Sequence, residues 1–224
     1  MALARVKNWI AEVLTYSDLN AEFNSILNNA NSLISPFTAN VAAGGFKLTG
    51  LGAATTAGDA LRYEQAGIKL STRQATTSGT AINFTGIPTL TKRITIMFNE
   101  VSTSGTSGLV VQIGDTDGIE TTVYVSTVAS LPNAAAIATG NYTSGFVVAN
   151  TVAATDVHSG TIVLTLENAA TFTWISAGTL KSNTTTMQLS AGSKSTSAEL
   201  DRVRITTVNG SDTFDAGTIN ISYE

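Results

Sequence analysis

The chain has 224 residues, a formal net charge of −4 and a charged fraction of only 12%. Its polar character comes mainly from 36 Thr, 21 Ser and 16 Asn, and a Thr-rich composition favours β-structure. No Cys and a single His exclude disulfide scaffolds, thiol catalysis, Cys-ligated metals and multi-His metal sites. The acidic balance provides no general basic field for nucleic acid, and no apolar run is long enough to span a bilayer.

The N-terminal segment does not have the pattern of an export signal. Its apolar stretch is interrupted by Glu12, whereas a signal peptide needs an unbroken apolar region. We therefore expect synthesis and assembly in a cytoplasm, with no membrane insertion.

Charge and periodicity divide the chain into three segments. Residues 1–73 carry six basic and five acidic side chains, whereas residues 74–224 carry six basic and eleven acidic ones. Spacing typical of a helix is confined to the first part, and the polar stretch after residue 73 is typical of a connection. We predict an N-terminal attachment segment with a short helix over 1–36, a linker or shaft over 37–75, and a β domain over 76–224.

A helix is predicted to start at the sequence TYSD, residues 15–18. A hydroxyl of this stretch can accept a hydrogen bond from a free N–H group of the first turn, and Asp18 suits its positive end. Behind this start, apolar residues recur in steps of 4, 3, 4 and 3, and Pro36 then ends the pattern: Leu19, Phe23, Ile26, Ala30 and Leu33. The helix either docks on its own domain or forms a short coiled coil with other copies. We favour the coiled coil, because the flanking segments provide no globular domain.

Two neighbouring segments also lack a core of their own. An apolar cluster precedes the helix, and it either folds back on the helix or attaches to the surface of another protein: Trp9, Ile10, Val13 and Leu14. Residues 37–66 are rich in Gly and Ala and too few to close a core, so they would be stable if identical copies wound around one another.

From residue 80 onward the sequence predicts strands at close spacing. The segment 93–98 alternates between polar and apolar residues, and segments 108–113 and 119–125 flank a turn at 114–118. Further strands are predicted at residues 145–150, 161–167, 171–175, 186–189, 200–207 and 216–223. This spacing predicts an antiparallel β-sandwich of the jelly-roll kind.

The candidate chemistry in the β domain is sparse. Asp115 and Asp117 precede Gly118 in a pattern that falls short of an EF-hand loop, so a plain turn is favoured over a calcium site. His158 lies in a predicted loop near Asp156, and no nucleophile motif accompanies it. We expect no catalytic residue, no metal ligand and no cofactor.

Receptor binding would use exposed aromatic and amide side chains in loops. Asn141 and Tyr142, in the long connection predicted over 129–144, are weak candidates for this role. Trp174 is a second aromatic candidate, but the alternation of its strand favours a place in the core.

Three motifs resemble small tail-fibre and appendage proteins of tailed bacteriophages. TYSDLNAEFN at 15–24, preceded by Trp9 and residues 12–14, resembles their N-terminal segment. GGFKLTGLG at 44–52, followed by GDALRYEQ at 58–65, is similar to their shaft repeat. DTFDAGTINI at 212–221, with Tyr223 and Glu224, resembles their C-terminal signature. The usual fibre has several shaft repeats, whereas this chain has about one.

The resemblance implies a homotrimeric virion fibre that is assembled in the host cytoplasm. Its N-terminus would attach to another virion protein of the tail, neck or capsid, its shaft would be intertwined, and its β head would meet a host-surface glycan or protein. One alternative is a capsid or neck decoration protein without a receptor role. Another is a small glycan-hydrolysing, tailspike-like enzyme, which needs a pair of carboxylates about 5–10 Å apart. Because eleven acidic residues in 74–224 make some pairing inevitable, we favour a non-enzymatic protein.

Overall fold

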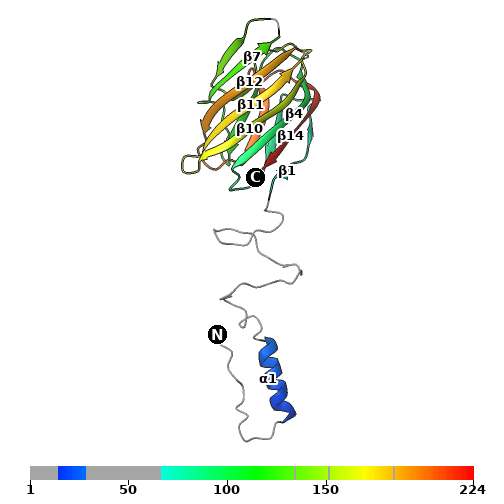
Figure 1. Ribbon diagram of the computed structural model, residues 1–224, viewed down its shortest axis with the longest axis vertical. Coiled ribbons are helices and arrows are strands. Elements are labelled where there is room, and N and C mark those ends of the chain that lie inside the picture. The colour runs from blue at the N-terminus through cyan, green and yellow to red at the C-terminus, as the bar shows by residue number, and fades with distance from the viewer. Residues whose placement is uncertain (1–14, 29–66, 134, 151, 184) are drawn as a thin grey trace. The chain divides into compact units, whose positions relative to one another are not determined.

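The structure, a computed structural model, describes residues 15–28, 67–133, 135–150, 152–183 and 185–224. Residues 1–65 and 66–224 form two units, and each is described by itself. The described part of the first unit is one helix, and the second unit consists of strands in two antiparallel sheets (Figure 1). The expected mainly β fold with a C-terminal sandwich is therefore confirmed.

Helix α1 spans Tyr16–Asn28 and begins where the sequence predicts. The Thr15 hydroxyl oxygen accepts a hydrogen bond from the Asp18 N–H at 3.2 Å, and the Asp18 carboxylate accepts one from the Thr15 N–H at 3.1 Å. This reciprocal pair satisfies backbone donors that a helix start leaves free. Leu19 and Phe23 are 43% and 56% exposed. The other apolar residues named for the coiled coil and for attachment lie outside the described side chains: Trp9, Ile10, Val13, Leu14, Ile26, Ala30 and Leu33.

No helix in the described ranges is both long enough and apolar enough to cross a membrane.

The larger sheet has nine strands, in the spatial order β1-β14-β4-β10-β11-β12-β7-β8, with β2 also paired to β14. Their bounds are β1 (Lys69–Leu70), β2 (Gln74–Ala75), β4 (Arg93–Thr103), β7 (Val125–Pro132), β8 (Ala138–Tyr142), β10 (His158–Asn168), β11 (Thr173–Ser182), β12 (Thr186–Ser195) and β14 (Phe214–Tyr223). Strands β10, β11 and β12 form a meander, which places residues 158–168, 173–182 and 186–195 side by side in the middle of the sheet.

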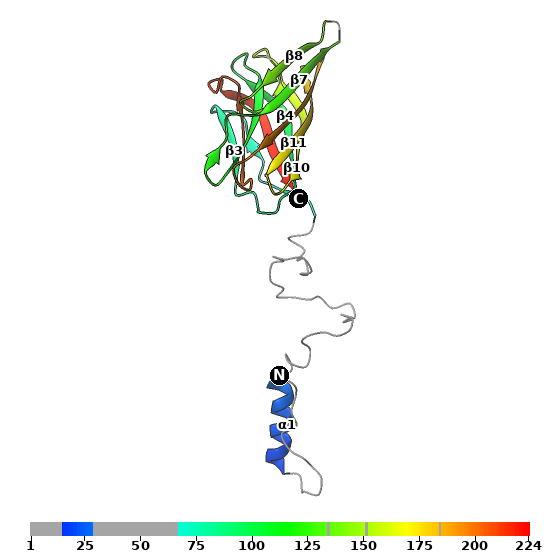
Figure 2. The same ribbon diagram turned by 90° about the vertical axis from the view of Figure 1, so that its left-hand side faces the viewer.

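The smaller sheet has five strands, in the order β3-β13-β5-β6, with β9 also paired to β5. Their bounds are β3 (Ala81–Thr85), β5 (Leu109–Asp115), β6 (Gly118–Ile119), β9 (Phe146–Ala149) and β13 (Arg202–Thr207). The chain passes repeatedly from one sheet to the other, and β3 and β10 lie on opposite sides of the sandwich (Figure 2).

The core lies between the two sheets. It forms because every second side chain along a strand points inward. In β4, Ile94, Ile96 and Phe98 point inward while the residues between them are less buried. Trp174 in β11 is 2% exposed, so its predicted place in the core is confirmed. Val203 and Ile205 of β13 meet these residues from the smaller sheet. Burying alternate side chains of both sheets is what makes the strands a sandwich.

The sandwich begins earlier in the chain than the segment expected from residue 76. Strands β1 and β2 pair with the C-terminal strand β14, and the Ser71 N–H donates to the Ile221 carbonyl at 2.9 Å. Residues 69–70 and 74–75, expected in the linker or shaft, are therefore paired in the larger sheet. The compact unit starts at Ala66.

Two predicted elements differ from the structure in the middle of the chain. The strand expected over 119–125 ends after Ile119, because Asp115 pairs with Gly118 in a tight hairpin and Val125 then starts β7 in the other sheet. The connection expected over 129–144 is instead largely the hairpin of β7 and β8. The sequence ATGNY of β8 lacks regular apolar alternation, so pattern alone does not reveal this strand.

His158 lies in a strand rather than in the predicted loop. It is the first residue of β10, pairs with Ser182 and Val101, and is only 1% exposed. Burial lowers the pKa of its imidazole to about 4, although the nearby Asp156 carboxylate opposes this shift. The Asp156 carboxylate accepts hydrogen bonds from the Ala153 N–H and the Asn183 side-chain amide, at 2.9 and 3.1 Å. His158 is therefore a neutral core residue at neutral pH.

Acidification should destabilise the sandwich through His158. The unfolded chain binds a proton on this residue near pH 6.5, whereas the folded chain binds it only near pH 4. Its stabilising contribution is thus complete above pH 6.5 and is lost as the pH falls to about 4, by up to about 3 kcal/mol in the free energy of unfolding. Urea denaturation at a series of pH values measures this loss.

The control is His158→Leu, which removes the titrating group and keeps an apolar side chain of similar size. This variant should have a flatter pH dependence of stability over the same range. An equally steep loss in both proteins would show that another group is responsible.

Candidate binding groove on the larger sheet

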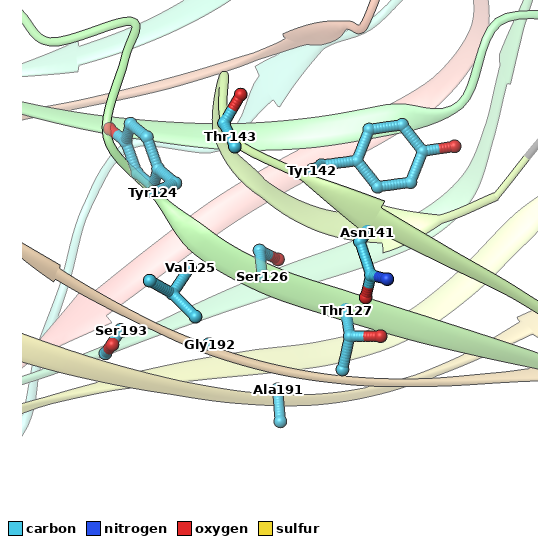
Figure 3. Close-up of a pocket in the computed structure, with 10 residues that line it drawn as sticks. All are labelled: Tyr124, Val125, Ser126, Thr127, Asn141, Tyr142, Thr143, Ala191, Gly192 and Ser193. Carbon is cyan, nitrogen blue, oxygen red and sulfur yellow. The ribbon is translucent and has the colours of Figure 1, made fainter.

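A groove with a volume of about 710 Å³ lies over strands β7, β8 and β12 (Figure 3). Its lining consists of residues from these strands and from the chain next to them: Tyr124, Val125, Ser126, Thr127, Asn141, Tyr142, Thr143, Ala191, Gly192 and Ser193. No charged residue is among them. The groove therefore suits an uncharged occupant.

The register of the sheet explains how this groove forms. Val125 lies opposite Ser193, and Thr127 lies between Ala191 and Asn141. These residues point away from the core, because their neighbours Ser126 and Val128 are buried. Small outward side chains on three adjacent strands leave a depression that larger ones would fill.

Several polar groups in the groove already have partners. The Ser126 hydroxyl accepts a hydrogen bond from the Val147 N–H at 2.9 Å and so connects the two sheets. The Tyr142 hydroxyl donates to the Asn150 side-chain oxygen at 2.7 Å. The side chains of Asn141, Thr143 and Ser193 form no hydrogen bond within the described ranges, so they are available to an occupant.

Tyr124 forms one end of the groove and is held rigidly. Its hydroxyl accepts a hydrogen bond from the Ile113 N–H at 2.8 Å and donates to the Glu120 carbonyl at 2.9 Å. Its ring meets Phe146 edge-on, with 5.0 Å between the ring centroids. Burial raises the pKa of the Tyr124 hydroxyl, and the Glu120 carboxylate adds to this effect. Tyr124 is therefore a neutral, fixed wall.

An ion pair with a buried lysine lies next to Tyr124. The Lys194 ammonium is 5.4 Å from the centroid of the Tyr124 ring and pairs with the Glu120 carboxylate. Lys194 is on β12 of the larger sheet, while Glu120 directly follows β6 of the smaller one. Lys194 is only 7% exposed and the Glu120 side chain 24%, so the pair ties the two sheets together with its ammonium buried and its carboxylate partly open to water.

The structure brings Asn141 and Tyr142 to the rim of this groove, as part of β8 rather than of a loop. The other outward residues of the groove were not predicted from the sequence, because the paired groove residues of β7 and β12 are more than 60 residues apart along the chain and only the strand register brings them together. The one usable signal is the run of small residues at 190–193 in an otherwise alternating strand.

The aspartates at 115 and 117 belong to a hydrogen-bonded turn. The Asp115 carboxylate accepts hydrogen bonds from the Ser197 hydroxyl, the Ala198 N–H and the Asp117 N–H at 2.6, 2.8 and 3.0 Å. Burial acts to raise the pKa of Asp115, but these hydrogen bonds outweigh it and lower the pKa overall. Among the residues that the structure describes, no three His, Cys, Asp or Glu side chains group as metal ligands would.

Breaking the ion pair should destabilise the head strongly. Glu120→Gln leaves the Lys194 ammonium buried without its counter-charge, which should cost about 3 kcal/mol or more in the free energy of unfolding. Adding Lys194→Met to this variant should recover much of the loss, because the uncompensated charge is gone. Denaturant unfolding curves of the single and double variants measure both effects.

A matched control is Glu167→Gln, at an exposed glutamate near the end of β10. It should be close to wild type in stability. If Glu120→Gln were as mild as this control, the ion pair would contribute little to the fold.

Comparison of the chain with protein-family models, with curated proteins and with solved structures finds no match.

Proposed function

We propose that the protein is a non-enzymatic structural component of a tailed bacteriophage particle, a homotrimeric tail fibre or appendage. In this proposal the N-terminal segment attaches to another virion protein, and the jelly-roll-like β head contacts the host surface. Support comes from the motifs at 15–24, 44–65 and 212–224, which resemble the attachment, shaft and C-terminal segments of such fibres.

The observation that carries the proposal is the surface of α1. Leu19 and Phe23 lie one helical turn apart, and both are substantially exposed. A 13-residue helix is only marginally stable alone in water, even with the good start that Thr15 and Asp18 provide. Packing these side chains against the same helix of other copies removes apolar surface from water and stabilises all the helices together.

Trimerisation would strengthen the proposed attachment of the protein to the host surface. Three heads held by one fibre act on a surface together, so their combined affinity exceeds that of a single head by orders of magnitude when the geometry lets them bind at once. A weak contact of each head with a host glycan or protein is then sufficient. This mode of action requires no cofactor and no bond-breaking chemistry.

Sedimentation equilibrium of the full chain tests the trimer. We expect a mass of three times the 23.1 kDa chain for the wild type. The double variant Leu19→Asn/Phe23→Ser should dissociate, because it removes the exposed apolar side chains of α1. The matched variant Asn20→Ser/Asn24→Ser changes polar positions on the same helix and should remain trimeric.

A monomeric wild type would contradict the proposal, and so would a double variant that sediments like its control. The position on the particle is tested separately, by imaging virions with an antibody against the β head. Label at the tail is the expected result, whereas label on the capsid or neck would favour a decoration protein.

A further inference from the structure

The outer face of the larger sheet carries large apolar side chains on three adjacent strands. Val125 of β7, Ile175 of β11, and Met187 and Leu189 of β12 are 70%, 42%, 50% and 44% exposed. We call these four residues the outer apolar face. Soluble monomers seldom leave such a group of large apolar side chains in water without a function.

The strand register places these residues on the same face, with small side chains between them. Ile175 lies opposite Ser193, which in turn lies opposite Val125 on the far side of β12. On the same strand as Ser193, Leu189 is next to Ala129 of β7 and Met187 is next to Leu131. At about 3.3 Å per residue, the outer apolar face extends about 20 Å along the strands, from Met187 at one end to Val125 and Ile175 at the other, and it includes the groove beside Val125.

This surface is almost free of charge. On strands β7, β8, β11 and β12, Lys181 is the one charged residue that points outward, since Lys194 points inward to Glu120. The acidic residues of the described part of the β domain lie on β4, β5, β10 and β14 and in the loops. The surface of a soluble protein usually carries about 25–35% charged residues, so the charged fraction of this face is unusually low.

We propose that the outer apolar face is covered by a second copy of this chain, so that the heads associate with one another directly. The inference rests on the proposed homotrimer and adds an interface to it that is separate from α1. Burial of Val125, Ile175, Met187 and Leu189 against a neighbouring head removes their exposed surface from water, and the groove beside Val125 accepts side chains of the neighbour.

The charges of the β domain favour a copy as the occupant. Residues 66–224 carry eight basic and eleven acidic side chains, a net charge of −3, so two heads repel each other over most of their surfaces. The electrostatic repulsion between two copies is weakest when they approach through the face that has no carboxylate. In the proposed trimer the outer apolar faces of three copies can meet around the threefold axis, where uncharged apolar surfaces fit one another and a strongly charged partner finds no counter-charge.

The proposal changes the role of two residues. Asn141 and Tyr142 lie at the rim of the groove and therefore within or beside the interface between heads, where the free amide of Asn141 can bond to the neighbour. Host contact then falls to the loops at the ends of the sandwich rather than to this rim.

Thiol labelling of the full chain tests the interface, because a protein without Cys accepts one reporter at any position. Leu189→Cys places the reporter on the outer apolar face, and Ile175→Cys gives a second reporter there. The control Thr85→Cys lies on an exposed position of β3, in the smaller sheet. In the assembled protein we expect a maleimide to react about tenfold or more slowly at 189 and 175 than at 85, because a packed interface excludes water and reagent.

The dissociating substitutions Leu19→Asn/Phe23→Ser separate the two proposals. Added to each Cys variant, they should bring the rates at 189 and 175 up towards the rate at 85, because the interface between heads is too weak to hold the chains together once α1 no longer does. Assembled trimers that react equally fast at 189, 175 and 85 would overturn the interface between heads and leave the fibre proposal intact. A wild type that is monomeric at all concentrations would overturn both.

Discussion

The fold depends on one constraint, the two-residue period of the side chains along each strand of the larger sheet. Ile94, Ile96 and Trp174 enter the core because their strands hold one register, and a slip by a single residue would exchange inner and outer faces. The same register aligns Val125, Thr127 and their partners on the outside. Core and outer surface are therefore two results of one pairing pattern, and neither can change without the other.

The sequence predicts those parts of the fold that depend on neighbours along the chain. Alternation predicts most of β4 and the burial of Trp174, and the short polar side chains of Thr15 and Asp18 predict the start of α1. The β7–β8 hairpin was missed because residues 138–142 have no clear alternation. The strand expected over 119–125 was wrong beyond Ile119, because the buried hydrogen bonds of Tyr124 turn the chain there. The groove was not predicted either, because the register between β7 and β12 joins residues far apart along the chain.

The few charged residues of the β domain have specific positions and contacts in the fold. Its few ionised groups do specific structural tasks, such as the Lys194–Glu120 pair between the sheets and the Asp115 carboxylate that holds the turn next to Ser197. The Thr and Ser residues occupy much of the outer surface of the central strands instead. Neutral hydroxyls keep this surface hydrated without the repulsion that like charges would add between closely spaced molecules.

The pairing of β1 and β2 with β14 has a consequence for the order of events during synthesis. These first strands of the head leave the ribosome about 150 residues before Ile221, whose carbonyl accepts the hydrogen bond from Ser71. The larger sheet cannot close at this edge until the last residues of the chain are made, and such long-range pairing folds slowly. Helix α1 emerges first and needs no distant partner from its own chain for its cap. Helix α1 can therefore form while the β domain of the same chain is still incomplete.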